Sequence, residues 1–122
     1  MKPRILIFDD DKEILIVCKI ILQQYNYAVE TRTCCENIVE DIIKVKPDVV
    51  LLDLWIPEIG GEKAIELMKM NKATKDTPVI LFSANTEIDE ICKRAHANGF
   101  LKKPFEIANL LQIIEKNILQ IH

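Results

Sequence analysis

The sequence predicts an α/β protein in which a doubly wound, five-stranded parallel sheet is covered by five helices. Short apolar runs alternate along the chain with longer amphipathic stretches, as is typical of strand–helix units. The runs are continuously apolar, which suits strands buried on both faces of a parallel sheet. Polar side chains follow directly after several of these runs. The helices are therefore expected on both faces of the sheet.

Four of the five expected strands are apolar runs, and one is weaker. The runs at 4–8 (RILIF), 48–53 (DVVLLD) and 78–82 (PVILF) are the clearest, and residues 100–101 form a short one. Residues 27–31 (YAVET) are less apolar, which indicates a strand at the edge of the sheet.

The first helix is expected to follow the aspartates that end the first run, with Asp11 at its cap or in its first turn. Its apolar residues recur at helical spacing and share one face: Ile14, Val17, Cys18, Ile21, Leu22 and Tyr25. The fourth helix is expected to begin at a cap formed by Asn85 or Thr86 and to stop at Asn98-Gly99.

The remaining helices follow the same spacing. The second lies around 38–43 and should end before Pro47, because the residue before a proline disfavours helix. The third carries apolar residues within 64–68, the fourth spans 86–97, and the last covers 107–118.

Length and composition predict one soluble globular domain over residues 1–122. The net charge is −3 and no basic stripe stands out, so no direct contact with nucleic acid is expected. No apolar run approaches the ~20 residues that span a bilayer, and no secretory signal precedes the early aspartates, so a cytoplasmic location is expected. The four cysteines lack zinc-site spacing, and His96 and His122 are isolated, so none is expected to bind a metal.

The most informative polar residues lie where the expected strands end. Asp9 and Asp10 follow the first strand, Asp53 ends the third, Ser83 follows the fourth, and Lys103 follows the fifth. In open α/β sheets the ligand crevice lies at the carboxyl ends of the strands. These side chains are therefore expected to converge in one pocket.

The chemistry of this set favours phosphoryl transfer. Clustered carboxylates repel one another unless a cation lies among them, and oxygen ligands favour a hard ion such as Mg²⁺. A lysine and a serine hydroxyl could stabilise further oxygens of a transferring phosphoryl group. A carboxylate at the centre, Asp53, could then act as the nucleophile and form an acyl phosphate.

With these residues in this order, the sequence resembles the receiver domain of response regulators, the CheY-like family of two-component signalling systems. The resemblance lies in four segments along the chain: ILIFDDD at 5–11, VVLLDLWIPEIGG at 49–61, PVILFSA at 78–84 and GFLKKPF at 99–105. It implies the flavodoxin-like (CheY-like) strand order 2-1-3-4-5. It also implies a receiver that accepts a phosphoryl group from a histidine kinase or a histidine phosphotransfer protein and then switches a protein-binding surface.

The resemblance assigns a role to each matching residue. Asp53 matches the phosphoacceptor and a metal ligand, Asp10 a direct Mg²⁺ ligand, Asp9 an acid that holds the metal through water, and the main-chain carbonyl of Trp55 a third ligand. Ser83 matches the hydroxyl that senses the phosphoryl group, Lys103 the lysine of the site, and Phe100 the aromatic switch position. Lys103–Pro104 is a candidate for a cis peptide bond, and Pro57 and Gly61 match loop positions after the acceptor.

The departures from the family pattern at four positions remove no functional group. Gly60 replaces a residue that is usually acidic or polar, which should loosen the loop before Gly61. Trp55 is bulky for its position. Phe100 and Ser83 are ordinary alternatives to the tyrosine and threonine found in many relatives.

The resemblance implies a signalling receiver that assists its own phosphorylation and dephosphorylation but is not otherwise an enzyme, and two other functions fit the sequence less well. A haloacid-dehalogenase-type phosphatase also uses an aspartyl nucleophile, but it needs a second aspartate two residues later, where this chain has Trp55. A phosphorylation-independent interaction module would tolerate the loss of Asp53, Ser83 or Lys103, and all three are present. Two architectures stay open: a stand-alone regulator, or one receiver within a larger regulator or hybrid kinase.

Overall fold

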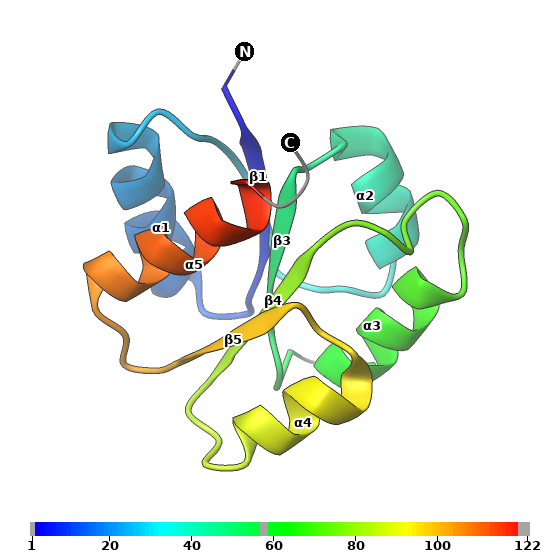
Figure 1. Ribbon diagram of the computed structural model, residues 1–122. Helices are drawn as coiled ribbons and strands as arrows, with labels where there is room; N and C mark the ends of the chain where they lie inside the picture. The colour runs from blue at the N-terminus through cyan, green and yellow to red at the C-terminus, as the bar shows by residue number, and fades with distance from the viewer. Residues whose placement is uncertain (1, 57–58, 120–122) are drawn as a thin grey trace.

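A computed structural model of the chain describes residues 2–56 and 59–119, and Pro57 lies outside them. Strands and helices alternate throughout (Figure 1). The strands are β1 (Arg4–Phe8), β2 (Ala28–Arg32), β3 (Val49–Asp53), β4 (Val79–Ser83) and β5 (Gly99–Lys102). The helices are α1 (Lys12–Gln24), α2 (Ile38–Val45), α3 (Gly60–Lys69), α4 (Ile88–Ala95) and α5 (Ile107–Leu119).

The strands form one parallel sheet in the order β2-β1-β3-β4-β5, which confirms the predicted fold class and strand order. Figure 1 shows α1 and α5 on one face of the sheet and α2, α3 and α4 on the other. Each face therefore closes a separate hydrophobic core. Every residue of β3 and β4 is buried, as the continuous apolar runs predicted. In β2 only Val29 is buried, which fits its place at the edge.

The first helix differs from the prediction in the face that it buries. Asp11 caps α1 as expected, because its Oδ1 accepts hydrogen bonds from the main-chain N–H groups of Glu13 and Ile14. The fully buried positions are Leu15, Cys18 and Leu22. Val17 and Tyr25, which the spacing placed on one face with Cys18 and Leu22, are more than half exposed, so that face is only partly buried.

The fourth helix is shorter than predicted. Asn85 does not cap it directly; its Oδ1 accepts the N–H of Glu87 in a turn that precedes α4. The helix ends at Ala95, because His96 takes a left-handed conformation with φ 60° and its N–H bonds back to the carbonyls of Cys92 and Lys93. Asn98 lies beyond this end, and its Oδ1 accepts the N–H of Val79.

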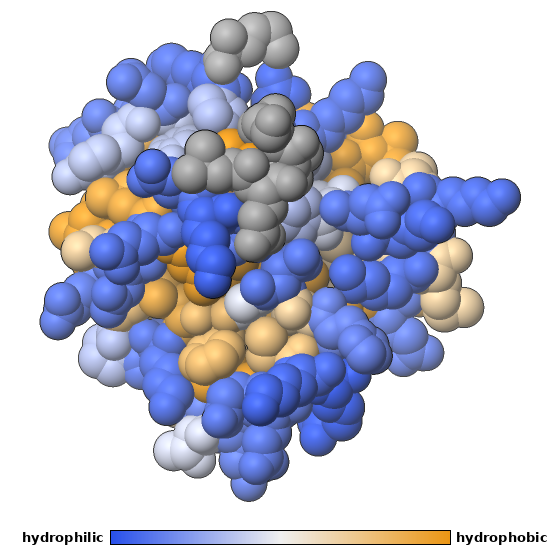
Figure 2. Space-filling view, in the orientation of Figure 1, coloured by the Kyte–Doolittle hydropathy of each residue, from blue (hydrophilic) through white to orange (hydrophobic). Residues whose placement is uncertain are grey.

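The outer surface is mainly hydrophilic on the face drawn in Figure 2, where apolar side chains gather in separate patches. Among the helices that the structure describes, none is both long and apolar enough to cross a membrane.

Candidate functional site

Four strands deliver the predicted polar side chains to one end of the sheet. Asp53 is the last residue of β3 and Ser83 the last of β4, and Asp9 and Lys103 follow directly after β1 and β5. Because the strands are parallel, their carboxyl ends all lie at the same end of the sheet. Asp9, Asp53 and Ser83 are buried there, although all three are polar.

Lys103 is the cation of this pocket. Its main-chain N–H donates to the carbonyl of Ser83 at 3.0 Å, which fixes the chain at the end of β4. Its Nζ donates to Asp9 Oδ2 at 2.7 Å and to Asp53 Oδ1 at 3.3 Å. The peptide bond between Lys103 and Pro104 is cis, as the resemblance to receiver domains implied. One ammonium group therefore serves two buried carboxylates.

The electrostatics of the pocket follow from this arrangement. Burial, and then the charge of Asp9, raise the pKa of Asp53, and Lys103 and the N–H of Trp55 offset only part of this effect. Burial alone would lower the pKa of Lys103, but its hydrogen bonds to Asp9 and Asp53 and their charges outweigh burial and raise that pKa. The pocket thus favours one charged ammonium and disfavours crowded carboxylates.

Asp10 completes an acidic cluster at the rim. One carboxylate oxygen from each of Asp9, Asp10 and Asp53 lies within 4.8 Å of the other two. Asp10 is exposed, whereas Asp9 is buried and accepts the N–H of Asp11 at 2.8 Å. Three carboxylates that converge around an opening to solvent form a donor set suited to a hard divalent cation. Asp9, Asp10 and Asp53 therefore fit a divalent cation such as Mg²⁺ in kind and in position.

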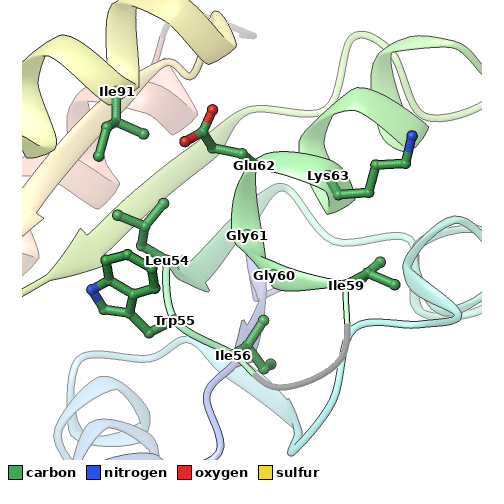
Figure 3. Close-up of a pocket in the computed structure, with 9 residues that line it drawn as sticks. All are labelled: Leu54, Trp55, Ile56, Ile59, Gly60, Gly61, Glu62, Lys63 and Ile91. Carbon is green, nitrogen blue, oxygen red and sulfur yellow. The ribbon is translucent and has the colours of Figure 1, made fainter.

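The loop after Asp53 borders a pocket of about 250 Å³ that extends toward α4 (Figure 3). Trp55 lines it and is 66% exposed. Figure 3 shows its indole beside the side chain of Leu54, on the opposite side of the loop from Ile59 and Lys63. The indole therefore flanks the Asp53 end of β3 without being packed into the core.

Two glycines close this loop for different reasons. A Cβ on Gly61 would lie 2.9 Å from the carbonyl oxygen of Asp53, so the close approach of α3 to the end of β3 requires glycine. Gly60 has φ +75°, a left-handed conformation that side chains disfavour. The departure at Gly60 therefore has a conformational reason, and the Sγ of Cys35 contacts its carbonyl at 3.8 Å.

The two predicted switch residues lie on neighbouring strands. Ser83 Oγ accepts the N–H of Asn85 at 3.1 Å. Phe100 is partly buried and packs against the core beneath α2, α3 and α4. Phe100 pairs with Leu81, whereas Ser83 pairs with Lys102, so the two switch positions are offset by two residues along the β4–β5 ladder.

Two contacts near the site were not foreseen from the sequence. Arg94 on α4 donates to Glu62 on α3 through Nη2 at 2.7 Å and through Nε at 3.2 Å. The Lys103 Nζ also lies 4.5 Å from the centroid of the Phe82 ring. In the sequence, Phe82 is one apolar residue of an expected buried strand, and no motif distinguishes it from its neighbours.

Comparison with known proteins identifies the class that this fold and site define. A model of the response regulator receiver domain matches residues 5–115. The chain belongs to the response regulator receiver domain family, and aspartyl phosphorylation in two-component signalling is the general function of that family.

The chain is similar to parts of longer regulators. It is 29% identical over 111 residues to the DNA-binding dual master transcriptional regulator RpaA of Synechocystis sp., covering 89% of this chain and 46% of RpaA. It is 33% identical over 121 residues to the nisin biosynthesis regulatory protein NisR of Lactococcus lactis, covering 97% of this chain and 51% of NisR. The chain thus spans about half the length of these relatives.

The chain is also similar to a solved receiver domain that binds a metal ion. The receiver domain of sensor histidine kinase PA1611 from Pseudomonas aeruginosa superposes with a TM-score of 0.88 at 25% identity, covering 97% of this chain and 98% of that one. That structure has a magnesium ion coordinated in its active-site cleft.

Proposed function

We propose that Asp53 is the residue of this receiver that accepts the phosphoryl group, in a Mg²⁺-dependent transfer from a histidine kinase or a histidine phosphotransfer protein. The observation that carries the proposal is the position of Asp53. Its carboxylate is buried at a strand end, 3.3 Å from the Lys103 ammonium and within the cluster formed with Asp9 and Asp10. An idle acid would be costly at such a place.

In the proposed transfer a carboxylate oxygen of Asp53 attacks the phosphorus of a phosphohistidine. The oxygen–phosphorus bond forms as the nitrogen–phosphorus bond breaks, and the imidazole nitrogen leaves with that electron pair. Lys103 would donate to one phosphoryl oxygen, because its Nζ already lies beside Asp53. Ser83 would donate its hydroxyl hydrogen to another, which its acceptance of the Asn85 N–H permits.

The metal would be held by the three carboxylates and by the main-chain carbonyl of Trp55. When bound, Mg²⁺ would neutralise negative charge on the oxygens that surround the phosphorus. Asp9, Asp10 and Asp53 supply the oxygen donors, and Asp10 faces the solvent from which the ion would enter. The hydrogen bond from the main-chain N–H of Trp55 lowers the pKa of the Asp53 carboxyl, which supports a place for the Trp55 main chain at this pocket.

The phosphodonor would dock beside the acidic loop. Three large apolar side chains on α1 are more than half exposed: Ile16, Val17 and Ile20. The helix that carries them begins one residue after Asp11. Exposed apolar side chains grouped on one helix favour contact with a partner protein. We propose that the phosphodonor binds to this surface.

We propose that the output of the domain is a changed protein-binding surface and not direct contact with nucleic acid.

Residues 1–122 would act as one receiver domain. The groups of the pocket would assist phosphorylation and dephosphorylation of the domain itself, with no separate substrate. A cytoplasmic location stays a prediction from the sequence.

Intact-mass measurement tests the proposal. With Mg²⁺ and acetyl phosphate, the protein should gain the mass of one phosphoryl group, and Asp53→Asn should gain none while keeping the circular-dichroism spectrum of the wild type. Asp48→Asn is the matched control, because Asp48 lies on the preceding loop at the opposite end of β3 and should leave the uptake intact. Equal uptake by Asp53→Asn would refute the assignment of the acceptor.

A further inference from the structure

The Phe82 ring lies beneath the ammonium group of Lys103, the cation of the pocket. Phe82 precedes Ser83 on β4 and pairs with Asp53 on β3. Its side chain is 1% exposed and belongs to the core on the α1 and α5 face of the sheet. Phe82 therefore lies on the strand that carries the Ser83 hydroxyl, directly across from Asp53 on the neighbouring strand.

The contact between Phe82 and Lys103 has the geometry of a cation–π interaction. Lys103 Nζ lies 4.5 Å from the ring centroid, well inside the ~6 Å at which such pairs attract. The Lys103 side chain is 18% exposed, so little water competes with the ring for the ammonium. Removal of water is the condition under which this attraction is strongest.

The ring is itself held in place. Phe105 meets it edge-on, with 6.5 Å between the ring centroids and 63° between the ring planes. The main chain of Lys103 is tied to the carbonyl of Ser83, the residue after Phe82. Both partners of the contact are thus anchored to β4, and the ring gives the long lysine side chain a fixed support.

The hydrogen-bond partners of Lys103 would change during a transfer. In the unphosphorylated protein the Nζ donates to Asp9 and Asp53, which uses two of the three N–H donors of the ammonium. A phosphoryl group on Asp53 would bring further acceptor oxygens to the same ammonium, so its hydrogen bonds would be rearranged around the new group. The attraction of a ring face is less directional than a hydrogen bond, so it can hold the ammonium while its partners change.

We propose that Phe82 is a positioning residue for phosphoryl transfer, whose ring holds the Lys103 ammonium against the site of the transferred group. This inference rests on the proposed role of Asp53. An aliphatic residue at 82 would fill the core and leave the ammonium without this support.

The test replaces Phe82 by trifluorophenylalanine, which nearly keeps the shape of the ring but withdraws electron density from its face. The initial rate of phosphorylation by acetyl phosphate should fall about fivefold, with the Mg²⁺ dissociation constant unchanged within twofold. Phe105 carrying the same substitution is the matched control and should keep the wild-type rate. A wild-type rate for the fluorinated Phe82 protein would overturn the proposal.

A double-mutant cycle separates positioning from packing. Phe82→Leu should slow phosphorylation of the wild type by about fivefold but should have no further effect in an Asp9→Asn, Lys103→Met background, which removes the ammonium together with the buried charge that it compensates. Equal slowing in both backgrounds would show that Phe82 acts through packing, and the proposal would fail while the proposed function stood. If the wild type itself gained no phosphoryl group, the proposed function would fail first.

Discussion

The Nζ of Lys103 lies 2.7 Å from Oδ2 of Asp9, a residue 94 positions earlier in the chain and fully buried. The same ammonium is farther from Asp53, at 3.3 Å. Lys103 therefore compensates the most deeply buried acid of the pocket as well as facing the proposed acceptor. Loss of this cation would leave Asp9 as an uncompensated buried charge, which is strongly destabilising.

Mg²⁺ should stabilise the folded protein. The carboxylate cluster exists only in the folded chain, so a ligand that binds it raises the free energy of unfolding by RT ln(1 + [Mg²⁺]/Kd), or about 1.4 kcal/mol at tenfold excess over Kd. Thermal melts across Mg²⁺ concentrations at pH 7 measure this rise. A melting temperature that does not respond to Mg²⁺ would contradict the metal site.

Asp10→Asn should remove most of that response and raise the stability of the metal-free protein, since it removes one of three crowded charges. Asp11→Asn is the matched control, because asparagine can still cap α1 and Asp11 lies outside the cluster. The metal assignment fails if Asp10→Asn keeps the full Mg²⁺ response.

The stability of the metal-free protein should fall as pH rises through the pKa of Asp53. Burial and the charge of Asp9 raise that pKa above its ordinary value of 3.8, so the folded chain holds the proton to a higher pH than the unfolded chain. The contribution of this group to stability is present below the unfolded pKa and is lost as pH rises through the folded one. Urea unfolding from about pH 4 to pH 8 should show Asp53→Asn gaining stability relative to the wild type. A constant difference across that range would argue against the raised pKa.

Trp55 should slow the loss of the phosphoryl group. Its indole is 66% exposed and belongs to the loop that follows Asp53. We expect the bulky indole to shield the phosphoryl group from an attacking water, and an indole cannot orient that water well. Trp55→Asn should accelerate autodephosphorylation by about fivefold, which corresponds to ~1 kcal/mol of barrier. Trp55→Phe keeps an aromatic shield and should stay near the wild-type rate. An unchanged or slower decay of Trp55→Asn would refute the shielding hypothesis.

Phosphorylation should be transmitted along β4 and β5. Movement of the Ser83 hydroxyl toward Asp53 would free space for Phe100 to rotate inward and would remodel the surface of α4, β5 and α5. Backbone amide shifts on addition of beryllofluoride, a phosphoryl mimic, should cluster at 83–105. Ser83→Ala should lose the shifts around Phe100 while keeping those beside Asp53. Shifts confined to the acidic loop in the wild type would contradict this switch.

The fold could be predicted because its signals are local and repeated. Continuous apolar runs such as 48–53 mark strands that are buried on both faces, and the weaker apolarity of 27–31 marks the edge. The convergence of Asp9, Asp53 and Lys103 could be predicted because the carboxyl ends of parallel strands lie together at one end of the sheet. The distances between the side chains of these residues could be obtained only from the structure.

Other features depend on contacts that a single sequence does not encode locally. Helical spacing in α1 allows two overlapping apolar stripes, and only packing against the sheet selects Leu15 over Val17. The end of α4 depends on His96, a residue type with no strong preference for stopping a helix. The contact of Phe82 with Lys103 depends on how the neighbouring strands β4 and β5 pair, so it appears only in three dimensions.

The most direct measurement is the position of the covalent phosphoryl group. Borohydride reduces an acyl phosphate to an alcohol, so a phosphorylated aspartate becomes homoserine and can be located by peptide mass spectrometry. After treatment with Mg²⁺ and acetyl phosphate, homoserine should be found at position 53, and omission of Mg²⁺ should greatly reduce it. Homoserine at position 9 or 10 and none at 53 would contradict the account.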